Sequence, residues 1–453
     1  MFPTVAITSL LAALAIAPVA GASQSAVRAP DGLKAVPDAA HVVSPSAKRG
    51  VKARAAQAAA TDPRAAEQWP LDGDAPMGLA SAWRQTTGGD LTVAIVDSGI
   101  DLGHPDLAPN LWTNPGEVPG NGVDDDGNGY VDDVNGYDFV EHDGAPQDGN
   151  GHGTHVAGIV GARGGNGIGV AGVSWRVKLM PVRVLDGAAR GTTTDVALGI
   201  RYAVDNGARI VNLSLAGPSS TPDLEDAVRY AQARGVLIVV AAGNEGADLA
   251  TAPTYPAAYG EGNVLGVAAT RRDGGLSSVS DYGPGADLAA PGEEILSTAL
   301  GGGYEWRTGT SMAAPEVTGA LALIAAARPD LDASGLANTL LGATRKVGLP
   351  VGTGALDVGA ALKSVIPAGS WVDGEPSPPL SGYTTSTTRK ASSKKPTTTA
   401  KKKATKKLTA TQKKARAKKA AAKKRAAAKK AAARKRAVKQ AAARKAAAAK
   451  QRR

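Results

Sequence analysis

Three polar residues that together could activate a nucleophile are widely separated in the chain. Asp97 ends an apolar run in VAIVDSGID, His152 lies in the glycine-rich segment NGHGTHVAG, and Ser311 precedes an apolar helical stretch in GTSMAAP. A serine hydroxyl becomes a nucleophile when a histidine accepts its proton and a carboxylate holds that histidine in the correct tautomer. Each residue alone has an ordinary role, as a turn former, a loop residue or a helix cap. The three together, in the order Asp, His, Ser, predict catalysis by a serine nucleophile.

The elements around these residues alternate between strands and helices. Short apolar runs typical of strands occupy residues 91–96, 177–185, 209–215, 236–242 and 263–269. Helical periodicity occupies residues 195–206, 223–234 and 311–328. This alternation predicts an α/β fold in which a mainly parallel central sheet is covered by helices on both faces. Each polar residue then lies at the end of an element, where a rigid scaffold can hold its side chain in a cleft.

The three motifs resemble the active-site signatures of the subtilases, the subtilisin-like serine endopeptidases, in their thermitase-like bacterial type. The matching segments are DSGID at 97–101, HGTHVAG at 152–158 and GTSMAAP at 309–315, and the resemblance extends from about Gln68 to Ile366. It implies a subtilisin-like three-layer α/β fold and the hydrolysis of peptide bonds in polypeptide substrates.

The resemblance also implies a role for each catalytic residue. Ser311 would be the nucleophile, His152 the general base and then the general acid, and Asp97 the carboxylate that orients the histidine. His155, the second histidine of HGTH, would be structural. Asn244, in AAGNEG, would donate its side-chain amide to the oxyanion of the transition state alongside the backbone N–H of the serine.

Substrate-binding residues follow from the same resemblance. The substrate would pair with one segment as an added strand, and the primary specificity pocket would lie beside that segment. The residues concerned are Ser214, Leu215, Ala216, Gly217, Ala242, Gly243 and Thr254. Ala216 replaces the usual glycine, and Glu316 and Thr318 replace the usual histidine and alanine. Tyr255–Pro256 matches a position at which relatives carry a cis proline.

Three groups of oxygen donors predict structural calcium, and no cofactor is expected for catalysis. The first group lies on an acidic, glycine-bent loop whose first half resembles an EF-hand loop, although Asn135 stands at the twelfth position; a plain acidic surface loop is the alternative. The second resembles the loop site of thermitase-like subtilases, and the third resembles the strong calcium site of subtilisins. In that order, the donors are Asp124, Asp126, Asn128 and Asp132 or Asp133; then Asp138, Glu141, Asp143 and Gln147; then Asp106, Asn166 and the carbonyls of Ile168 and Val170.

Composition divides the chain into five segments. Residues 1–22 have the apolar core and small-residue cleavage site of a secretory signal, and no later apolar run has the length of a bilayer-spanning helix. Residues 23–66 form a leader with little periodicity, shorter and simpler than the folded propeptide that such subtilases often carry. The peptidase domain covers 67–366, a Pro/Ser/Thr linker covers 367–388, and a Lys/Ala-rich tail covers 389–453.

Charge and composition restrict the chemistry further. The chain lacks cysteine, which excludes disulfides and thiolate chemistry. Residues 389–453 contain 28 of the 52 Lys and Arg residues and none of the 41 Asp and Glu residues, which leaves a net charge of −17 on residues 1–388. The tail resembles those of linker histones and histone-like bacterial proteins, and we expect it to be disordered. In an exported protein, such a cationic tail favours an anionic cell-wall or surface polymer as its partner over nucleic acid. A solvated tail without a partner is the alternative.

Two functions from different classes fit the sequence. The first is a secreted or surface-associated, calcium-stabilised serine endopeptidase that acts as a monomer. The second is a polyanion-binding surface protein that uses a protease-like body as a scaffold. The catalytic set favours the enzyme, because a scaffold derived from a protease typically lacks at least one catalytic residue.

Overall fold

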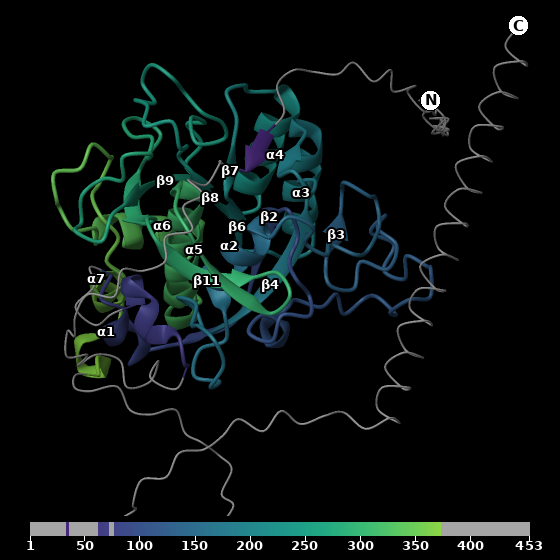
Figure 1. Ribbon diagram of the computed structural model, residues 1–453, viewed down its shortest axis with the longest axis horizontal. Coiled ribbons are helices and arrows are strands. Elements are labelled where there is room, and N and C mark those ends of the chain that lie inside the picture. The colour runs from purple at the N-terminus through teal and green to yellow at the C-terminus, as the bar shows by residue number, and fades with distance from the viewer. Residues whose placement is uncertain (1–32, 36–61, 72–76, 373–453) are drawn as a thin grey trace, which may run out of the picture. The chain divides into compact units, whose positions relative to one another are not determined.

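A parallel sheet of seven strands forms the centre of the computed structural model, which describes residues 33–35, 62–71 and 77–372 (Figure 1). The predicted signal at 1–22, most of the leader and linker, and the tail with its expected disorder lie outside the described residues. Every neighbouring pair in the sheet is parallel. In spatial order the strands are β10 (Leu288–Pro291), β9 (Val264–Thr270), β8 (Leu237–Ala241), β6 (Ile210–Leu213), β2 (Gly88–Asp97), β4 (Arg176–Arg183) and β3 (Tyr137–Asp138).

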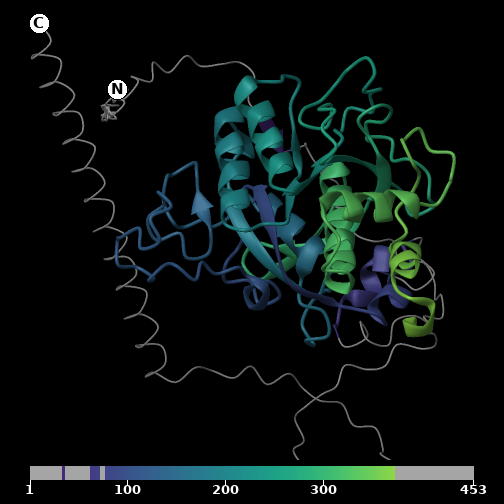
Figure 2. The same cartoon turned by 180° about the vertical axis from the view of Figure 1, so that it is seen from behind.

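Helices cover both faces of this sheet. Successive side chains of a strand point to opposite faces, and in β2 Val93 and Ile95 join one buried apolar cluster while Ala94 and Val96 join the other. The first cluster includes helices α2 (His152–Gly161) and α5 (Thr310–Ala327); the second includes α3 (Thr193–Asp205) and α4 (Pro222–Ala233). Seen from behind, α3 and α4 lie together and apart from α5 (Figure 2). The predicted three-layer α/β class with a mainly parallel sheet is confirmed.

The long apolar helix that begins at the predicted nucleophile is a core element. It contacts β2, β6, β8, β9 and β10, which are five of the seven strands. Within the described part of the chain, α5 is the one helix with the length and apolarity needed to cross a membrane, and 89% of it is buried inside the protein. Its apolar character therefore reflects its place against the sheet.

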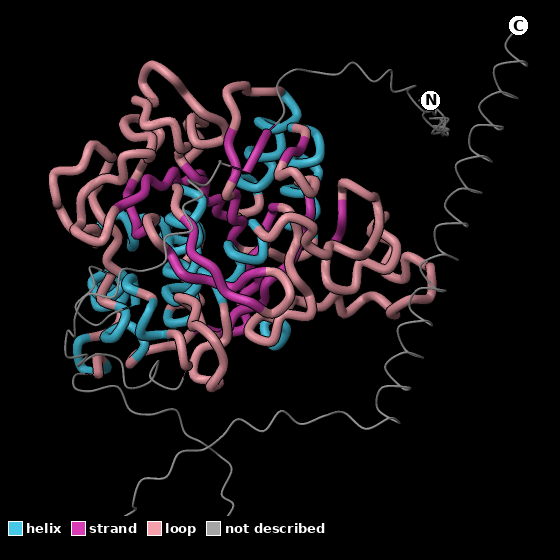
Figure 3. The backbone as a smooth tube through the Cα atoms, viewed as in Figure 1, coloured by secondary structure: helices cyan, strands magenta, loops and turns pink. Residues whose placement is uncertain are grey.

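Loops and small sheets surround these layers (Figure 3). Much of the segment between β2 and α2 is loop, and it carries most of the acidic residues predicted to bind calcium, some of them buried, such as Asp106 and Asp138, and others exposed, such as Asp126. A hairpin packs against α2, and a separate three-stranded sheet contains a strand from the leader. The hairpin is β11 (Ile295–Ala299) and β12 (Gly303–Arg307), and the sheet has the order β5 (Arg190–Gly191), β1 (Leu33–Ala35) and β7 (Leu215–Ala216).

Ordered contacts extend beyond the predicted limits of the peptidase domain at both ends. On the N-terminal side, a short turn (η2, Ala65–Glu67) is followed by another (η3, Trp69–Leu71). On the C-terminal side, the backbone N–H and carbonyl of Val372 bond to the side-chain amide of Gln85. The three remaining α-helices lie near this end and contact one another through α7: α1 (Leu79–Trp83), α6 (Ala333–Gly342) and α7 (Val358–Val365).

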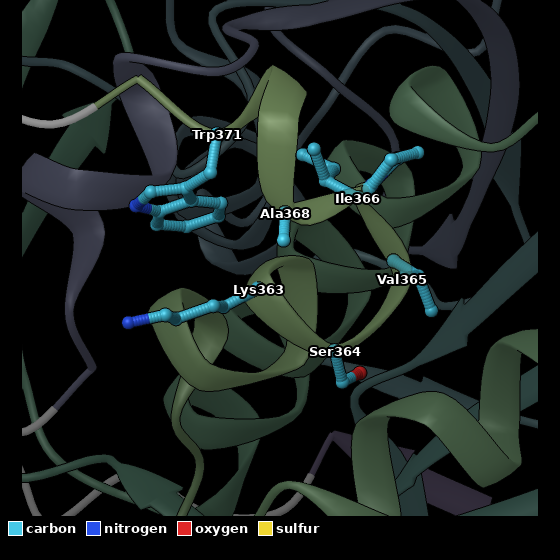
Figure 4. Close-up of a pocket in the computed structure, with 7 residues that line it drawn as sticks. Lys363, Ser364, Val365, Ile366, Ala368 and Trp371 are labelled. Atoms are coloured by element: carbon cyan, nitrogen blue, oxygen red, sulfur yellow. The ribbon is translucent and has the colours of Figure 1, made fainter.

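A surface pocket of about 530 Å³ lies where α7 ends (Figure 4). Its lining includes the Lys363 side chain, whose Nζ lies 5.9 Å from the centre of the Trp371 ring. None of the predicted catalytic or substrate-binding residues lines it. The predicted catalytic residues lie elsewhere, at the ends of the sheet strands.

Candidate active site

Three neighbouring strands of the sheet deliver polar residues to the same edge. Asp97 is the last residue of β2, Ser214 directly follows β6, and Asn244 lies just after β8. The carboxyl ends of parallel strands meet at one edge, which is where open α/β sheets place their ligands. Two helices begin at this site, α2 at His152 and α5 one residue before Ser311.

Asp97 and His152 form a buried pair. The Nδ1 atom of His152 lies 2.7 Å from Oδ1 of Asp97, and the side chains are 2% and 0% exposed. The backbone N–H of Ser98 donates to the same carboxylate oxygen at 2.7 Å, which fixes the carboxylate. An ionised carboxylate only accepts hydrogen bonds, so the imidazole proton belongs on Nδ1. Nε2 is then the ring nitrogen that can accept a proton.

Ser311 is buried at the start of α5 and is tied to Ser214. The Ser311 hydroxyl donates to the backbone carbonyl of Ser214 at 3.2 Å, and the Ser214 hydroxyl donates to the backbone carbonyl of Ser311 at 2.9 Å. Behind them, Asn212 Nδ2 donates to the Ser214 hydroxyl, and the Thr318 hydroxyl donates to Asn212 Oδ1. The sequence did not suggest Asn212; its place two residues before Ser214 was the available signal.

The side-chain oxygen of Asn244 is held by the residue before the serine. Thr310 donates to Asn244 Oδ1 from its backbone N–H at 2.8 Å and from its hydroxyl at 2.9 Å. Gly243 must be glycine, because its φ is +126° and a Cβ there would lie 2.0 Å from Oδ2 of Asp281. Thr310 thus fixes the plane of the Asn244 amide next to Ser311.

The predicted substrate-binding segments lie beside each other. Gly217 and Tyr255 exchange backbone hydrogen bonds of 3.1 and 2.8 Å, and the Thr254 hydroxyl donates to the carbonyl of Ala242 at 2.6 Å. The Tyr255–Pro256 peptide bond is cis. The structure therefore brings the stretch from Ser214 to Gly217 next to the stretch around Thr254.

Two further polar residues near the site are buried. Nε2 of His155 lies within hydrogen-bond distance of the carbonyls of Ile295 and Glu305, and burial lowers the pKa of His155 well below its ordinary value of 6.5. Burial likewise raises the pKa of the Glu316 carboxyl well above its ordinary value of 4.5. Glu316 lines a cavity of about 10 Å³ together with Gln68. Burial therefore favours the neutral form of both side chains.

Comparison with known proteins identifies the family. A family model described as the subtilase family matches residues 88–361, more than half of the chain. The chain belongs to the subtilase family. This subtilase is 43% identical to thermitase of Thermoactinomyces vulgaris over 244 residues, which cover 54% of this chain and 78% of thermitase. It is 43% identical to the major intracellular serine protease of Bacillus subtilis (strain 168) over 240 residues, covering 52% of this chain and 69% of that protein.

A solved structure supports the same assignment. This structure, described as proteases from Pseudoalteromonas arctica PAMC 21717, is 31% identical to this subtilase, with a TM-score of 0.58. The match covers 67% of this chain and 98% of that chain. The prediction that the protein is a serine-type endopeptidase is thereby confirmed.

Asp106 is the centre of one group of oxygen donors in this subtilase. Its carboxylate accepts hydrogen bonds from Asn166 Nδ2 at 2.8 Å, the Val170 N–H at 3.1 Å and the Tyr304 hydroxyl at 2.8 Å. Asp62, which the sequence did not suggest, accepts bonds from the N–H groups on either side of Asn166. Burial and the charge of Asp106 raise the pKa of Asp62. The buried carboxylates of Asp62 and Asp106 therefore both bind the loop around Asn166. The groups named here that donate hydrogen bonds to them are uncharged.

The acidic loop places some of its predicted ligands together and others apart. Ligand oxygens of Asp124, Asp126 and Glu117 lie within 4.8 Å of one another, and Glu117 was not anticipated from the sequence. Asn128 Nδ2 donates to Asp126 at 3.2 Å, which keeps Asn128 in the group. The Asp132 carboxylate instead accepts backbone N–H groups at residues 120–122, so it faces a different turn.

The remaining predicted calcium group is divided between several partners. The Asp138 carboxylate forms an ion pair with Arg183 and accepts the backbone N–H of Glu141. Asp143 accepts the N–H of Ala145. The Gln147 amide lies 3.4 Å from the Asp101 carboxylate. Because Arg183 already places a positive charge next to the Asp138 carboxylate, Asp138 is the weakest candidate for a metal ligand in this group.

Proposed function

We propose that this subtilase is an exported endopeptidase in which Ser311, His152, Asp97 and Asn244 hydrolyse peptide bonds. The observation that carries the proposal is the contact of 2.7 Å between His152 Nδ1 and Asp97 Oδ1. The pair lies at the sheet edge where Ser214 links to Ser311 and where Thr310 links to Asn244. These links support the assignment of the four residues to one active site.

In the proposed mechanism the imidazole of His152 transfers two protons, one in each half of the reaction. Ser311 Oγ forms a bond to the substrate carbonyl carbon while its proton passes to Nε2 of His152, and Asp97 stabilises the resulting imidazolium. The imidazolium then gives this proton to the leaving nitrogen, and the C–N bond breaks to leave an ester on Ser311. Water gives a proton to His152 as it attacks the ester, and His152 passes this second proton to Ser311 Oγ as the acid product leaves.

Asn244 stabilises the negative charge that develops on the substrate carbonyl oxygen. Its side-chain oxygen is held by both donors of Thr310, so its amide hydrogens have a fixed direction before substrate binds. A preorganised donor of this kind acts only when charge develops, and therefore accelerates the chemical step.

Structural calcium belongs to this proposal, most strongly at Asp106. Two buried carboxylates, the Asn166 side chain and nearby backbone carbonyls supply the hard oxygen ligands that calcium prefers, and no cationic side chain bonds to either carboxylate among the contacts described above. The ligands would be Asp62, Asp106, Asn166 and the carbonyls of Ile168 and Val170. A bound ion would supply the positive charge that these carboxylates otherwise lack.

Export and anchoring rest on the sequence. Residues 1–22 have the pattern of a secretory signal, and the family alone does not decide the compartment, since one relative is named an intracellular protease. The 28 basic residues of the tail favour attachment to an anionic wall or surface polymer. A polyanion-binding protein without peptidase activity is the second candidate, and the intact catalytic set argues against it.

Covalent labelling tests the proposal. The full chain should be modified at Ser311 by a serine-directed sulfonyl fluoride and should hydrolyse an unstructured protein. Ser311→Ala should lose both reactions with an unchanged melting temperature, whereas Ser278→Ala, at an exposed serine, should lose neither. Hydrolysis at the wild-type rate by Ser311→Ala would refute the mechanism.

A further inference from the structure

The turn that carries Asn244 is bound on both sides by one buried residue, Asp281. Before Asn244, the carbonyl of Gly243 accepts the Asp281 N–H at 2.9 Å. After Asn244, the N–H groups of Glu245 and Ala247 donate to Oδ1 of Asp281 at 2.9 and 2.8 Å. Asp281 thus fixes both ends of the short stretch of backbone from which the Asn244 side chain projects.

The segment that contains Asp281 is itself joined to the central sheet. The Ser280 hydroxyl accepts the N–H of Ala269, a residue of β9, at 2.8 Å. The same segment binds the turn once more, because the Gly246 N–H donates to the carbonyl of Val279 at 3.0 Å. Asp281 therefore belongs to a support that connects the turn after β8 to the neighbouring strand β9.

The second carboxylate oxygen of Asp281 is buried without a hydrogen-bond partner among the described residues. This oxygen, Oδ2, lies against the backbone of Gly243, where an added Cβ would be only 2.0 Å away. Burial also raises the pKa of the carboxyl above its ordinary value of 3.8. A buried acceptor without a partner destabilises a fold, so stability alone does not explain an aspartate at this position. The bonds that Oδ1 makes beside Asn244 offer the explanation.

Asn244 is thus held at two places by two different elements. Thr310, at the start of α5, binds its side-chain oxygen, and Asp281 binds the backbone around it. A donor to an oxyanion accelerates the reaction only when its direction is set before charge develops, and such a group must be held to within about 0.5 Å. Thr310 sets the rotation of the amide, whereas the backbone sets the position of its nitrogen. A displaced turn would therefore misplace the amide.

We propose that Asp281 is a positioning residue for catalysis in this subtilase, which holds the turn after β8 so that Asn244 can donate to the oxyanion. This inference rests on the proposed function of Asn244. Asp281 acts through Asn244 and does not itself bind the substrate. The effect belongs to the acceptor oxygen Oδ1 and not to the charge of the carboxylate, because both groups that bind Oδ1 are uncharged backbone N–H donors.

The first test compares kcat and KM of full-length variants on a small neutral peptide. Asp281→Ala removes the acceptor and should lower kcat by about ten- to hundredfold with KM within about threefold of wild type, because a misplaced oxyanion donor affects the transition state. Asp281→Asn keeps an acceptor oxygen for the two N–H donors and should retain kcat to within about threefold. Asp273→Ala, at an exposed aspartate between β9 and β10, is the control. A wild-type kcat in Asp281→Ala, or an equal loss in Asp281→Asn, would overturn the inference.

A double-mutant cycle separates positioning from a general structural role. In the Asn244→Ala background the amide is absent, so adding Asp281→Ala should lower kcat by no more than about twofold further. A purely structural effect of Asp281 would lower kcat by the same factor in both backgrounds. Equal factors would therefore overturn the inference.

Asp281→Ser replaces Asp281→Ala in both tests if the alanine variant does not fold. Its hydroxyl is too short to accept both N–H bonds in place, so kcat should fall, and the fall should again disappear in the Asn244→Ala background. An unchanged kcat, or the same fall in both backgrounds, would overturn the inference. The wild-type chain identifies the other kind of failure, because absence of both hydrolysis and sulfonyl fluoride labelling at Ser311 would overturn the proposed function itself.

Discussion

Ser214 and Ser311 bind each other through reciprocal hydrogen bonds, each hydroxyl donating to the backbone carbonyl of the other at 2.9 and 3.2 Å. Ser214 belongs to the segment that continues into β7, and Ser311 lies at the start of α5. The strand proposed to receive the substrate and the helix that carries the proposed nucleophile are therefore joined at one point. Asn212 and Thr318 extend this hydrogen-bond chain into the core.

Ser214→Ala should weaken both stability and catalysis. The substitution leaves the buried Ser311 carbonyl and the Asn212 amide without the Ser214 hydroxyl, and an unsatisfied buried group costs about 1–3 kcal/mol. We expect the free energy of unfolding to fall by about that amount and kcat/KM to fall by about tenfold. Denaturant unfolding and peptide hydrolysis measure the two effects. Ser278→Ala, at an exposed serine, is the control and should change neither.

Asn244→Ala should slow the chemical step without abolishing it. Removing one donor to the oxyanion reduces kcat by about 10²–10³ and should leave KM nearly unchanged, because the donor acts in the transition state. The variant should still react with a sulfonyl fluoride at Ser311. Asn338→Ala, on an exposed face of α6, serves as the control. A wild-type kcat in Asn244→Ala would show that another group fills the role.

Glu316 should make the stability of the protein fall as pH rises. Burial raises the pKa of its carboxyl, so the folded state holds the proton more tightly than the unfolded state. This contribution is complete below the ordinary pKa of 4.5 and is lost as pH rises from there toward the folded pKa.

The matched variant Glu316→Gln keeps the shape of the side chain and removes this titration. As pH rises above 4.5 toward the raised pKa of the folded protein, the stability of wild type should decline relative to Glu316→Gln by at most about 1.4 kcal/mol per pH unit, which urea unfolding at several pH values would measure. Glu294→Gln, at an exposed glutamate, should follow wild type. Parallel curves for wild type and Glu316→Gln would contradict the prediction.

Calcium removal should lower the melting temperature. An ion bound only by the native state stabilises it in proportion to the logarithm of its free concentration, so the melting temperature should rise as calcium is added back. Asp106→Asn should reduce this dependence, because it removes a charge from the buried ligand group. Asp223→Asn, at an exposed aspartate of α4, should retain it. A melting temperature insensitive to strong chelators would refute structural calcium.

The tail should bind polyanions in a salt-dependent manner. With duplex DNA as the test polyanion, the logarithm of the binding constant should fall with the logarithm of salt concentration by about 0.9 per phosphate neutralised, so ten contacts give a slope of roughly −9. A chain ending at residue 388 should lose this binding and keep its rate on a small neutral peptide.

The position of that truncation follows from the structure. Gln85 bonds to both backbone groups of Val372, so a cut at Pro367 would remove contacts of the folded body. Retention of polyanion binding after removal of residues 389–453 would refute anchoring by the tail. Loss of peptide hydrolysis on removal would show that the tail supports the fold.

Local patterns were sufficient to predict the α/β class and the catalytic motifs. The strands at 93–96 and 236–242 are apolar throughout because both faces of the sheet are buried there, and a pattern of that kind can be recognised without the partner strands. Each motif also carries its residue at the end of an element. Leader residues 33–35 gave no such signal, since a three-residue strand is too short to show periodicity.

The sequence by itself determined which residues could do chemistry and the layers that would hold them, because residue type and hydrophobic period are local properties. Only the tertiary structure decided which distant groups meet. It brought Asp62 to the Asn166 loop, Glu117 to Asp124 and Asp126, and Thr318 behind Ser214. It also placed β1 between β5 and β7, where its partners are backbone groups from remote segments. Backbone hydrogen bonds carry no side-chain signature, so a sequence cannot reveal with which remote strand they will form.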